Sequence, residues 1–138
     1  MERIPAGNVD FYVETREGVR DGGPSIQVKT TIDDSDVQLL RFDCFRGRPH
    51  YHYAPTGFDA GYDIDPTLVS DSLAWVITQL GTNLGPMLER AGHPALAETV
   101  DPAAVAGALR EVKEHFHATV VEVGGVGGKP QESWGRSQ

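Results

Sequence analysis

Residues 41 to 53 hold the side chains of this chain that are best suited to chemistry. An arginine, an aspartate and two histidines fall within this stretch, at Arg41, Asp43, His50 and His52. Histidines two apart on a strand project to the same side, so both imidazoles can reach one ion or ligand. With one carboxylate they form a set that holds zinc, manganese or non-haem iron. The sequence therefore predicts a divalent metal ion as a candidate cofactor, with Asp43, His50 and His52 as ligands.

The same side chains permit uses without a metal. Arg41 could bind the carboxylate or phosphate of a small anionic ligand while a histidine moves a proton, because histidine titrates near neutral pH. In that reading the candidate catalytic residues are Arg41, Asp43, His50 and His52. A purely structural arrangement is equally open: an Arg–Asp pair across two strands, and exposed histidines that hydrogen-bond to Asp43.

A β-hairpin is expected to position these residues. Leu39–Phe45 and Arg48–Ala54 suit strands, joined by a two-residue turn at Arg46-Gly47. One face of this hairpin is apolar, and burial of that face would select the register, since a slip by one residue would bury the charges. The apolar face comprises Leu40, Phe42, Cys44, Pro49, Tyr51 and Tyr53. On the polar face, Asp43 lies opposite His50, and Arg41 lies opposite His52.

The rest of the chain predicts further strands and then helices. Val9–Glu14 and Ser25–Ile32 alternate apolar and polar residues, as strands with one buried face do. Residues 1–8 are expected to be a leader, and residues 55–65 a loop. Three helices are expected. Two would begin at Asp65-Pro66 and Asp101-Pro102 and carry an apolar stripe on one side, and a shorter one would cover residues 83–91. The β-branched residues 118–123 indicate a fifth strand.

These elements predict one two-layer α+β domain over residues 1–123. An antiparallel sheet of four to five strands would carry about three helices on one face, and the other face would stay open with the polar residues on it. A glycine-rich tail follows over residues 124–138, with Trp134 as the expected anchor if it docks.

Two other groups of candidate residues are less suited to a site. His115 and His117 would diverge on a helix, so the sequence favours an interaction with the helix dipole and leaves open whether they join the site. Cys44 falls on the apolar face and is expected to be a buried small hydrophobe.

Charge and composition exclude several classes of protein. The net charge is −8, and the basic cluster around Arg41, Arg46 and Arg48 is small, which disfavours nucleic-acid binding. No apolar run could span a membrane, no signal peptide is recognisable, and a single cysteine is typical of a reducing compartment, so a cytoplasmic protein is expected. The open face could also be covered by a second copy in a homodimer.

Residues 41–53, R-F-D-C-F-R-G-R-P-H-Y-H-Y, resemble a motif of small uncharacterised bacterial domains. In that motif an Arg-aromatic-Asp stretch precedes Pro-His-x-His. The stretch is also loosely similar to the R-W-D-N…P-H-H pattern of TumE-type toxins of toxin–antitoxin pairs, but it lacks the Asn after the Asp. The matching positions are Arg41, Asp43, His50 and His52. The resemblance implies a shared scaffold more than a shared activity.

Three functions remain in view, and the sequence leaves open whether the protein is an enzyme. The first is small-molecule binding or acid–base catalysis at an Arg, Asp and two-His site on the open sheet face. The second is a non-catalytic protein that binds a partner or itself. The third is a toxin-like module that acts on RNA, against which the net charge argues.

Overall fold

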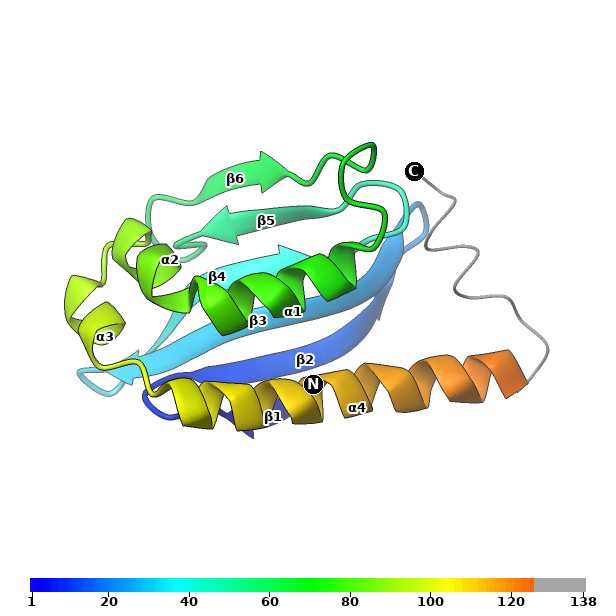
Figure 1. Ribbon diagram of the computed structural model, residues 1–138. Helices are drawn as coiled ribbons and strands as arrows, with labels where there is room; N and C mark the ends of the chain where they lie inside the picture. The colour runs from blue at the N-terminus through cyan, green and yellow to red at the C-terminus, as the bar shows by residue number, and fades with distance from the viewer. Residues whose placement is uncertain (126–138) are drawn as a thin grey trace.

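The computed structural model describes the backbone of residues 1–125 and the side chains of residues 1–117. An antiparallel sheet dominates it, and each strand pairs with its neighbours in the sequence (Figure 1). The expected α+β class with an antiparallel sheet is confirmed, but the sheet has six strands instead of four to five. The strands are β1 (Glu2–Pro5), β2 (Asp10–Glu17), β3 (Gly22–Ile32), β4 (Ser35–Asp43), β5 (His50–Tyr53) and β6 (Ala60–Asp63).

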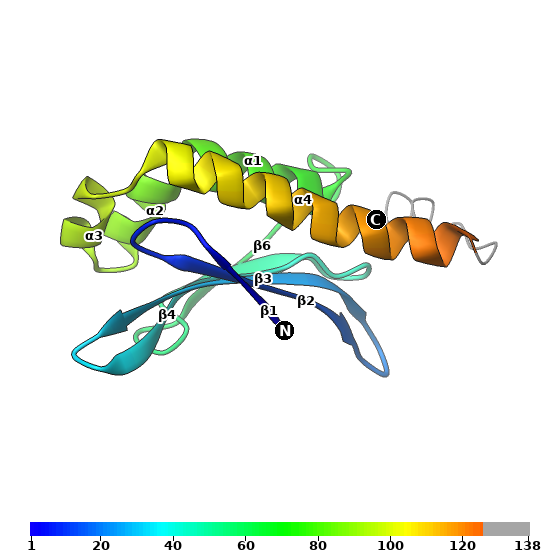
Figure 2. The same ribbon diagram turned by 90° about the horizontal axis from the view of Figure 1, so that it is seen from below.

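The helices form a layer on one face of the sheet (Figure 2). Among the described residues they are α1 (Ser72–Thr82), α2 (Leu84–Arg90), α3 (Pro94–Glu98) and α4 (Pro102–Gly125). The helix α4 begins at the expected Asp101-Pro102 start, where the Asp101 carboxylate accepts hydrogen bonds from the N–H groups of Ala103 and Ala104. No helix in the described part of the chain is both long and apolar enough to cross a membrane.

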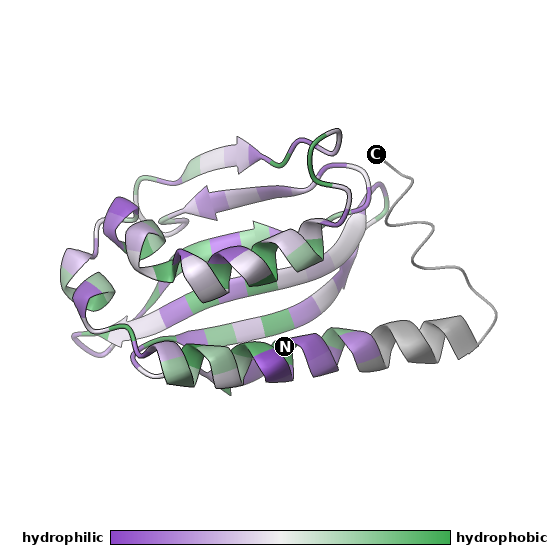
Figure 3. Cartoon of the chain, in the orientation of Figure 1, coloured by the Kyte–Doolittle hydropathy of each residue, from purple (hydrophilic) through white to green (hydrophobic). Residues whose placement is uncertain are grey.

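Alternation along β2, β3 and β4 builds the core between the two layers (Figure 3). Phe11 of β2, Val28 of β3 and Leu40 of β4 lie side by side in register and are fully buried. Val76 and Leu80 of α1 are fully buried above the sheet. Because side chains alternate between faces, the residues between these positions lie on the opposite, open face.

The two additional strands come from segments that we expected to be irregular. Residues 1–8, expected to be a leader, contain β1, and the expected loop 55–65 contains β6. Both are four-residue edge strands, and in both the alternation is too short to indicate a strand. Pairing with a longer neighbour, and the burial of Ile4, form β1 in spite of that weak local pattern.

Two further expectations about elements are wrong. Residues 118–123 continue α4 and form no fifth strand, because helix begun upstream overrides their β-branched preference. Asp65-Pro66 begins a turn in which Asp65 accepts from the Thr67 N–H, and α1 starts later, after the N-cap Asp71. Residues 126–138, including the expected Trp134 anchor, lie outside the described residues.

The open face of the sheet is concave. At both ends the sheet bends away from the helical layer (Figure 2). Three polar residues at the centre of this face are buried although the helices lie on the other side: Ser25 at 0%, Gln27 at 8% and Asp43 at 1% exposure. The open face thus has a polar floor that water barely reaches.

Candidate functional site

The β4–β5 hairpin brings the predicted residues onto the open face in the expected register. Asp43 pairs with His50, and Arg41 pairs with His52. The expected two-residue turn is wrong, because β4 ends at Asp43 and β5 begins at His50. Instead of pairing with β5, the next residues continue along β3, where the N–H groups of Cys44 and Arg46 donate to the carbonyls of Pro24 and Gly22.

Asp21 holds the connection between the two strands. Its carboxylate accepts hydrogen bonds from the backbone N–H groups of Gly47 and Arg48, each at 2.9 Å, and from that of Gly22. Burial acts to raise the pKa of Asp21, but these three N–H groups outweigh it and lower the pKa. We call these three hydrogen bonds the Asp21 clamp. The clamp fixes the course of the chain immediately before His50.

Asp43 is the buried centre of the cluster. Its Oδ1 accepts a 2.8 Å hydrogen bond from the Ser25 hydroxyl, and its Oδ2 lies 3.2 Å from Arg41 Nε and 3.1 Å from His50 Nε2. Burial acts to raise the pKa of Asp43, but the hydrogen bonds from His50 and Ser25 and the charge of Arg41 outweigh it and lower the pKa. Asp43 is therefore an ionised carboxylate on the floor of the open face.

His50 is oriented by a backbone carbonyl. Its Nδ1 lies 2.9 Å from the Arg48 oxygen, which can only accept, so Nδ1 carries a proton. Its Nε2 then faces the Asp43 carboxylate, an arrangement that is attractive only if a cation, either a proton or a metal ion, lies at Nε2. The hydrogen bond to Asp43 raises the pKa of His50, more than burial lowers it.

His52 is oriented by a carboxylate. Its Nδ1 lies 2.8 Å from Asp59 Oδ1, so Asp59 accepts the Nδ1 proton, and in the neutral ring Nε2 carries the lone pair. Asp59 belongs to the β5–β6 loop, where Ala54 and Asp59 both adopt left-handed backbone angles, φ 47° and 49°. Gly61 lies opposite His52 in β6, and a Cβ there would come within 3.3 Å of the ring, so glycine leaves room for this imidazole.

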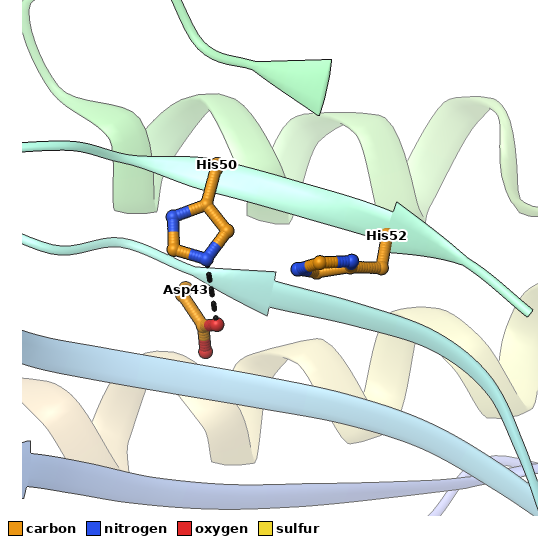
Figure 4. Close-up of side chains that lie close together, drawn as sticks. All are labelled: Asp43, His50 and His52. Carbon is orange, nitrogen blue, oxygen red and sulfur yellow. Dashed lines mark ion pairs between the residues drawn. The ribbon is translucent and has the colours of Figure 1, made fainter. Parts of the chain in front are cut away.

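The three predicted ligand residues converge. Asp43, His50 and His52 each offer one ligand atom, and these atoms lie within 4.8 Å of one another. Figure 4 shows the His52 ring directed toward the other two residues, with Nε2 at its leading end. The 3.1 Å between His50 Nε2 and Asp43 Oδ2 is close to the roughly 3 Å that separates two ligands of one transition-metal ion.

Arg41 lies beside this cluster and keeps part of its guanidinium available. In the described part of the chain, Nε is the only Arg41 nitrogen in a hydrogen bond or ion pair, and the side chain is 27% exposed. The four predicted side chains therefore share one face, with three able to hold a cation and one able to hold an anion.

The remaining candidates lie elsewhere. Cys44 is fully buried on the helix-facing side, and burial raises its pKa to about 12, so the thiol is inert. His115 of α4 lies 3.2 Å from Glu2 of β1, and His117 is exposed on the same helix, so neither joins the cluster.

Sequence reasoning missed three residues that shape the site. Asp21 and Asp59 are loop residues, and the contact of each with the hairpin depends on loop geometry that alternation does not encode. Gln27 occupies a polar position of the alternating strand Ser25–Ile32, where an exposed side chain is expected, but the structure buries it on the concave face. The one feature of the sequence that could have indicated Asp59 is that a carboxylate residue follows the His50-x-His52 pair closely along the chain.

A comparison with protein families finds one that covers most of the chain. A family model described as a domain of unknown function, DUF7700, matches residues 3–116. The chain belongs to this family. The matched region contains all six strands of the sheet except the first residue of β1, and every residue of the candidate site described above. No curated protein and no solved structure matches the chain.

Proposed function

We propose that the protein binds one divalent first-row metal ion through Asp43, His50 and His52, and uses it in small-molecule binding or catalysis on the open sheet face. The observation that carries the proposal is the pair of hydrogen bonds at Nδ1. Arg48 O holds His50, and Asp59 holds His52, so that both Nε2 atoms face the cluster. Metal-binding histidines in proteins are oriented in the same way.

The ligand set resembles catalytic metal sites more than structural ones. Structural zinc sites use four protein ligands, whereas sites with three leave positions for water or a substrate. Among the described residues, the cluster offers three ligand residues, and the side chains of His50 and His52 are 25% and 20% exposed. A bound ion would supply Lewis acidity there. Asp43 and the two histidines would hold it, and Ser25 would keep the carboxylate oriented.

A second candidate is acid–base chemistry without a metal. Arg41 and His50 both contact Asp43 Oδ2, so a proton at His50 Nε2 satisfies the same geometry that an ion would. In that case Arg41 would bind an anionic substrate, and His50 would exchange a proton with it.

Metal uptake by protein without a histidine tag separates the two candidates. Purified protein is loaded with Zn²⁺, passed over a desalting column and analysed for bound metal. We expect about one ion per chain in the wild type and in His117→Ala, because His117 is exposed and remote. His50→Ala and His52→Ala should retain little. Equal and low metal in all four proteins would overturn the metal proposal and leave the acid–base candidate.

A further inference from the structure

The open face offers unused hydrogen-bond donors next to the proposed metal site. Only Nε of Arg41 donates a hydrogen bond to Asp43. In the described chain, the two terminal amino groups of Arg41 have no hydrogen-bond partner. Arg41 pairs in register with Gln27 of β3 on one side and with His52 of β5 on the other. Arg41 therefore stands between Gln27 and a proposed metal ligand in the sheet, and its free amino groups lie on the same face as both.

Gln27, opposite Arg41 on the neighbouring strand, provides a second donor on the open face. The residue is 8% exposed, and its Oε1 accepts a 2.7 Å hydrogen bond from Gln38 Nε2. With Oε1 engaged, the Gln27 amide nitrogen is left with two N–H groups and no acceptor among the described residues. In the described chain, Asn8 Oδ1 is the one buried side-chain polar atom without a partner, so the Gln27 amide nitrogen reaches solvent and can donate to a ligand on the open face.

The charge around these donors defines what they would bind. With a divalent ion in place, Arg41 and the ion supply three positive charges, and Asp43 and Asp59 supply two negative ones. On the same face, the Arg3–Asp10 and Arg48–Asp63 pairs each cancel, and the charge of Lys29 on β3 is offset by that of Glu14 on β2. The net single positive charge suits a monoanion better than phosphate, which carries close to two negative charges near neutral pH.

From these observations we propose that the site binds the carboxylate group of a small organic monoanion. One carboxylate oxygen would accept from the Arg41 terminal amino groups and the other from Gln27, while the rest of the molecule lies at the open metal positions. A guanidinium edge matches the planar geometry of a carboxylate. This inference rests on the proposed metal site, because without the ion the local charge is negative.

Co²⁺-loaded protein tests the inference, because the visible spectrum of the ion reports on its surroundings. Acetate is titrated at constant ionic strength, with acetamide as the neutral analogue and inorganic phosphate as the more highly charged anion. We expect acetate to change the spectrum saturably, phosphate to bind more weakly, and acetamide to have no effect. A response to acetamide equal to that to acetate would overturn the inference.

Variants of Arg41 and Gln27 distinguish specific hydrogen bonding of the carboxylate from a general attraction between charges. Arg41→Gln should weaken acetate binding by about tenfold or more, since a charged hydrogen bond is lost. Arg41→Lys, which keeps the charge and the fold, should fall between it and the wild type, and Gln27→Met should weaken binding by several-fold. Lys29→Gln removes a charge from the same face of β3, where Lys29 lies over the Tyr12 ring, and should change acetate affinity little.

Two failures would be told apart. Co²⁺ uptake with no acetate response, or with equal acetate affinity in the wild type and both Arg41 variants, overturns the carboxylate inference alone. If the wild type takes up no Co²⁺, the metal proposal fails, and the inference fails with it.

Discussion

At the scale of single residues, the site depends on side chains that orient the proposed ligands. Asp59 is the clearest case, because it reaches His52 from a left-handed loop position that asparagine also tolerates. Asp59→Asn should therefore keep the loop and remove only the charge behind Nδ1. We expect metal affinity to fall by about tenfold, as is typical when such an orienting partner is changed.

A competition titration with a chelator of known affinity measures that change. The matched control is Asp36→Asn, which removes the same charge from an exposed position of β4, opposite Thr31. Equal metal affinity in the Asp59→Asn variant and the control would show that Asp59 does not orient His52.

Gly61 gives a steric test of the same imidazole. A methyl group at this position would lie 3.3 Å from His52 Nδ1 and 3.4 Å from Cε1, tighter than an ordinary contact, so the ring must tilt. Gly61→Ala should weaken metal binding by several-fold with little change in the free energy of unfolding. Gly57→Ala, in the loop that precedes β6, serves as the control, because its Cβ would meet only ordinary contacts. Metal titration and chemical denaturation measure the two effects, and unchanged metal affinity in Gly61→Ala would contradict the described packing.

At the scale of elements, the β4–β5 hairpin shows which part of the site a sequence can predict. Alternation alone sorted Arg41, Asp43, His50 and His52 onto one face in the register that the structure has, because burial of the other face selects that register. Alternation could not predict the course of the connection between β4 and β5. Arg-Gly is a poor two-residue turn, and hydrogen bonds to β3 and Asp21, remote in sequence, decide its course.

The missed edge strands and the misread end of α4 have a common cause. In each case tertiary or neighbouring structure overrides a weak local preference. The β6 strand, A-G-Y-D, has no alternation to detect, yet it contributes Gly61, which makes room for His52. Local patterns therefore located the candidate ligands but not the residues that hold them in place.

Asp21 allows the hairpin connection to be tested as a unit. Asp21→Asn replaces one of the two accepting oxygens by an amide nitrogen, so one of its backbone hydrogen bonds is lost. We expect a loss of about 1–2 kcal/mol in the free energy of unfolding. Asp34→Asn, in the β3–β4 turn where φ is 63°, should change it little, because asparagine adopts that conformation readily. Urea denaturation measures both, and an Asp21→Asn variant as stable as the wild type would contradict the clamp.

The same clamp predicts a dependence on pH. The pKa of Asp21 in the folded chain is lower than its ordinary value of 3.8. A carboxyl with a lowered pKa adds stability above its unfolded pKa, and that stability is lost as the pH falls through the folded pKa. The difference in unfolding free energy between wild type and Asp21→Asn should therefore be largest near neutral pH and shrink below pH 3.8. A difference that stays constant down to acid pH would show that the charge of Asp21 is not involved.

At the scale of the whole molecule, metal binding should be linked to folding. The three proposed ligands come from two strands, and they converge only in the folded sheet. A ligand that binds only the folded chain stabilises it by about 2.7 kcal/mol at a free concentration 100 times its dissociation constant. Zn²⁺ should therefore raise the melting temperature of the wild type by several degrees and leave that of His50→Ala unchanged. A scanning calorimeter reads this out, and equal shifts in both proteins would point to binding elsewhere.

The overall acidity of the molecule is consistent with a small-molecule site more than with a nucleic-acid surface. The net charge is −8, while the cations of the open face near the site are mostly paired with carboxylates in Arg3–Asp10, Arg41–Asp43 and Arg48–Asp63. Homodimerisation over the open face stays a prediction, and sedimentation analysis of the purified protein would measure it.

The convergence of two imidazoles and one carboxylate on a single point is tested most directly by a crystal structure of the protein soaked with Zn²⁺. Anomalous scattering locates the ion without reference to the protein atoms. We expect one strong peak about 2.0–2.2 Å from Asp43 Oδ2, His50 Nε2 and His52 Nε2. A peak only at other residues, or none with the three side chains arranged as described, would contradict it.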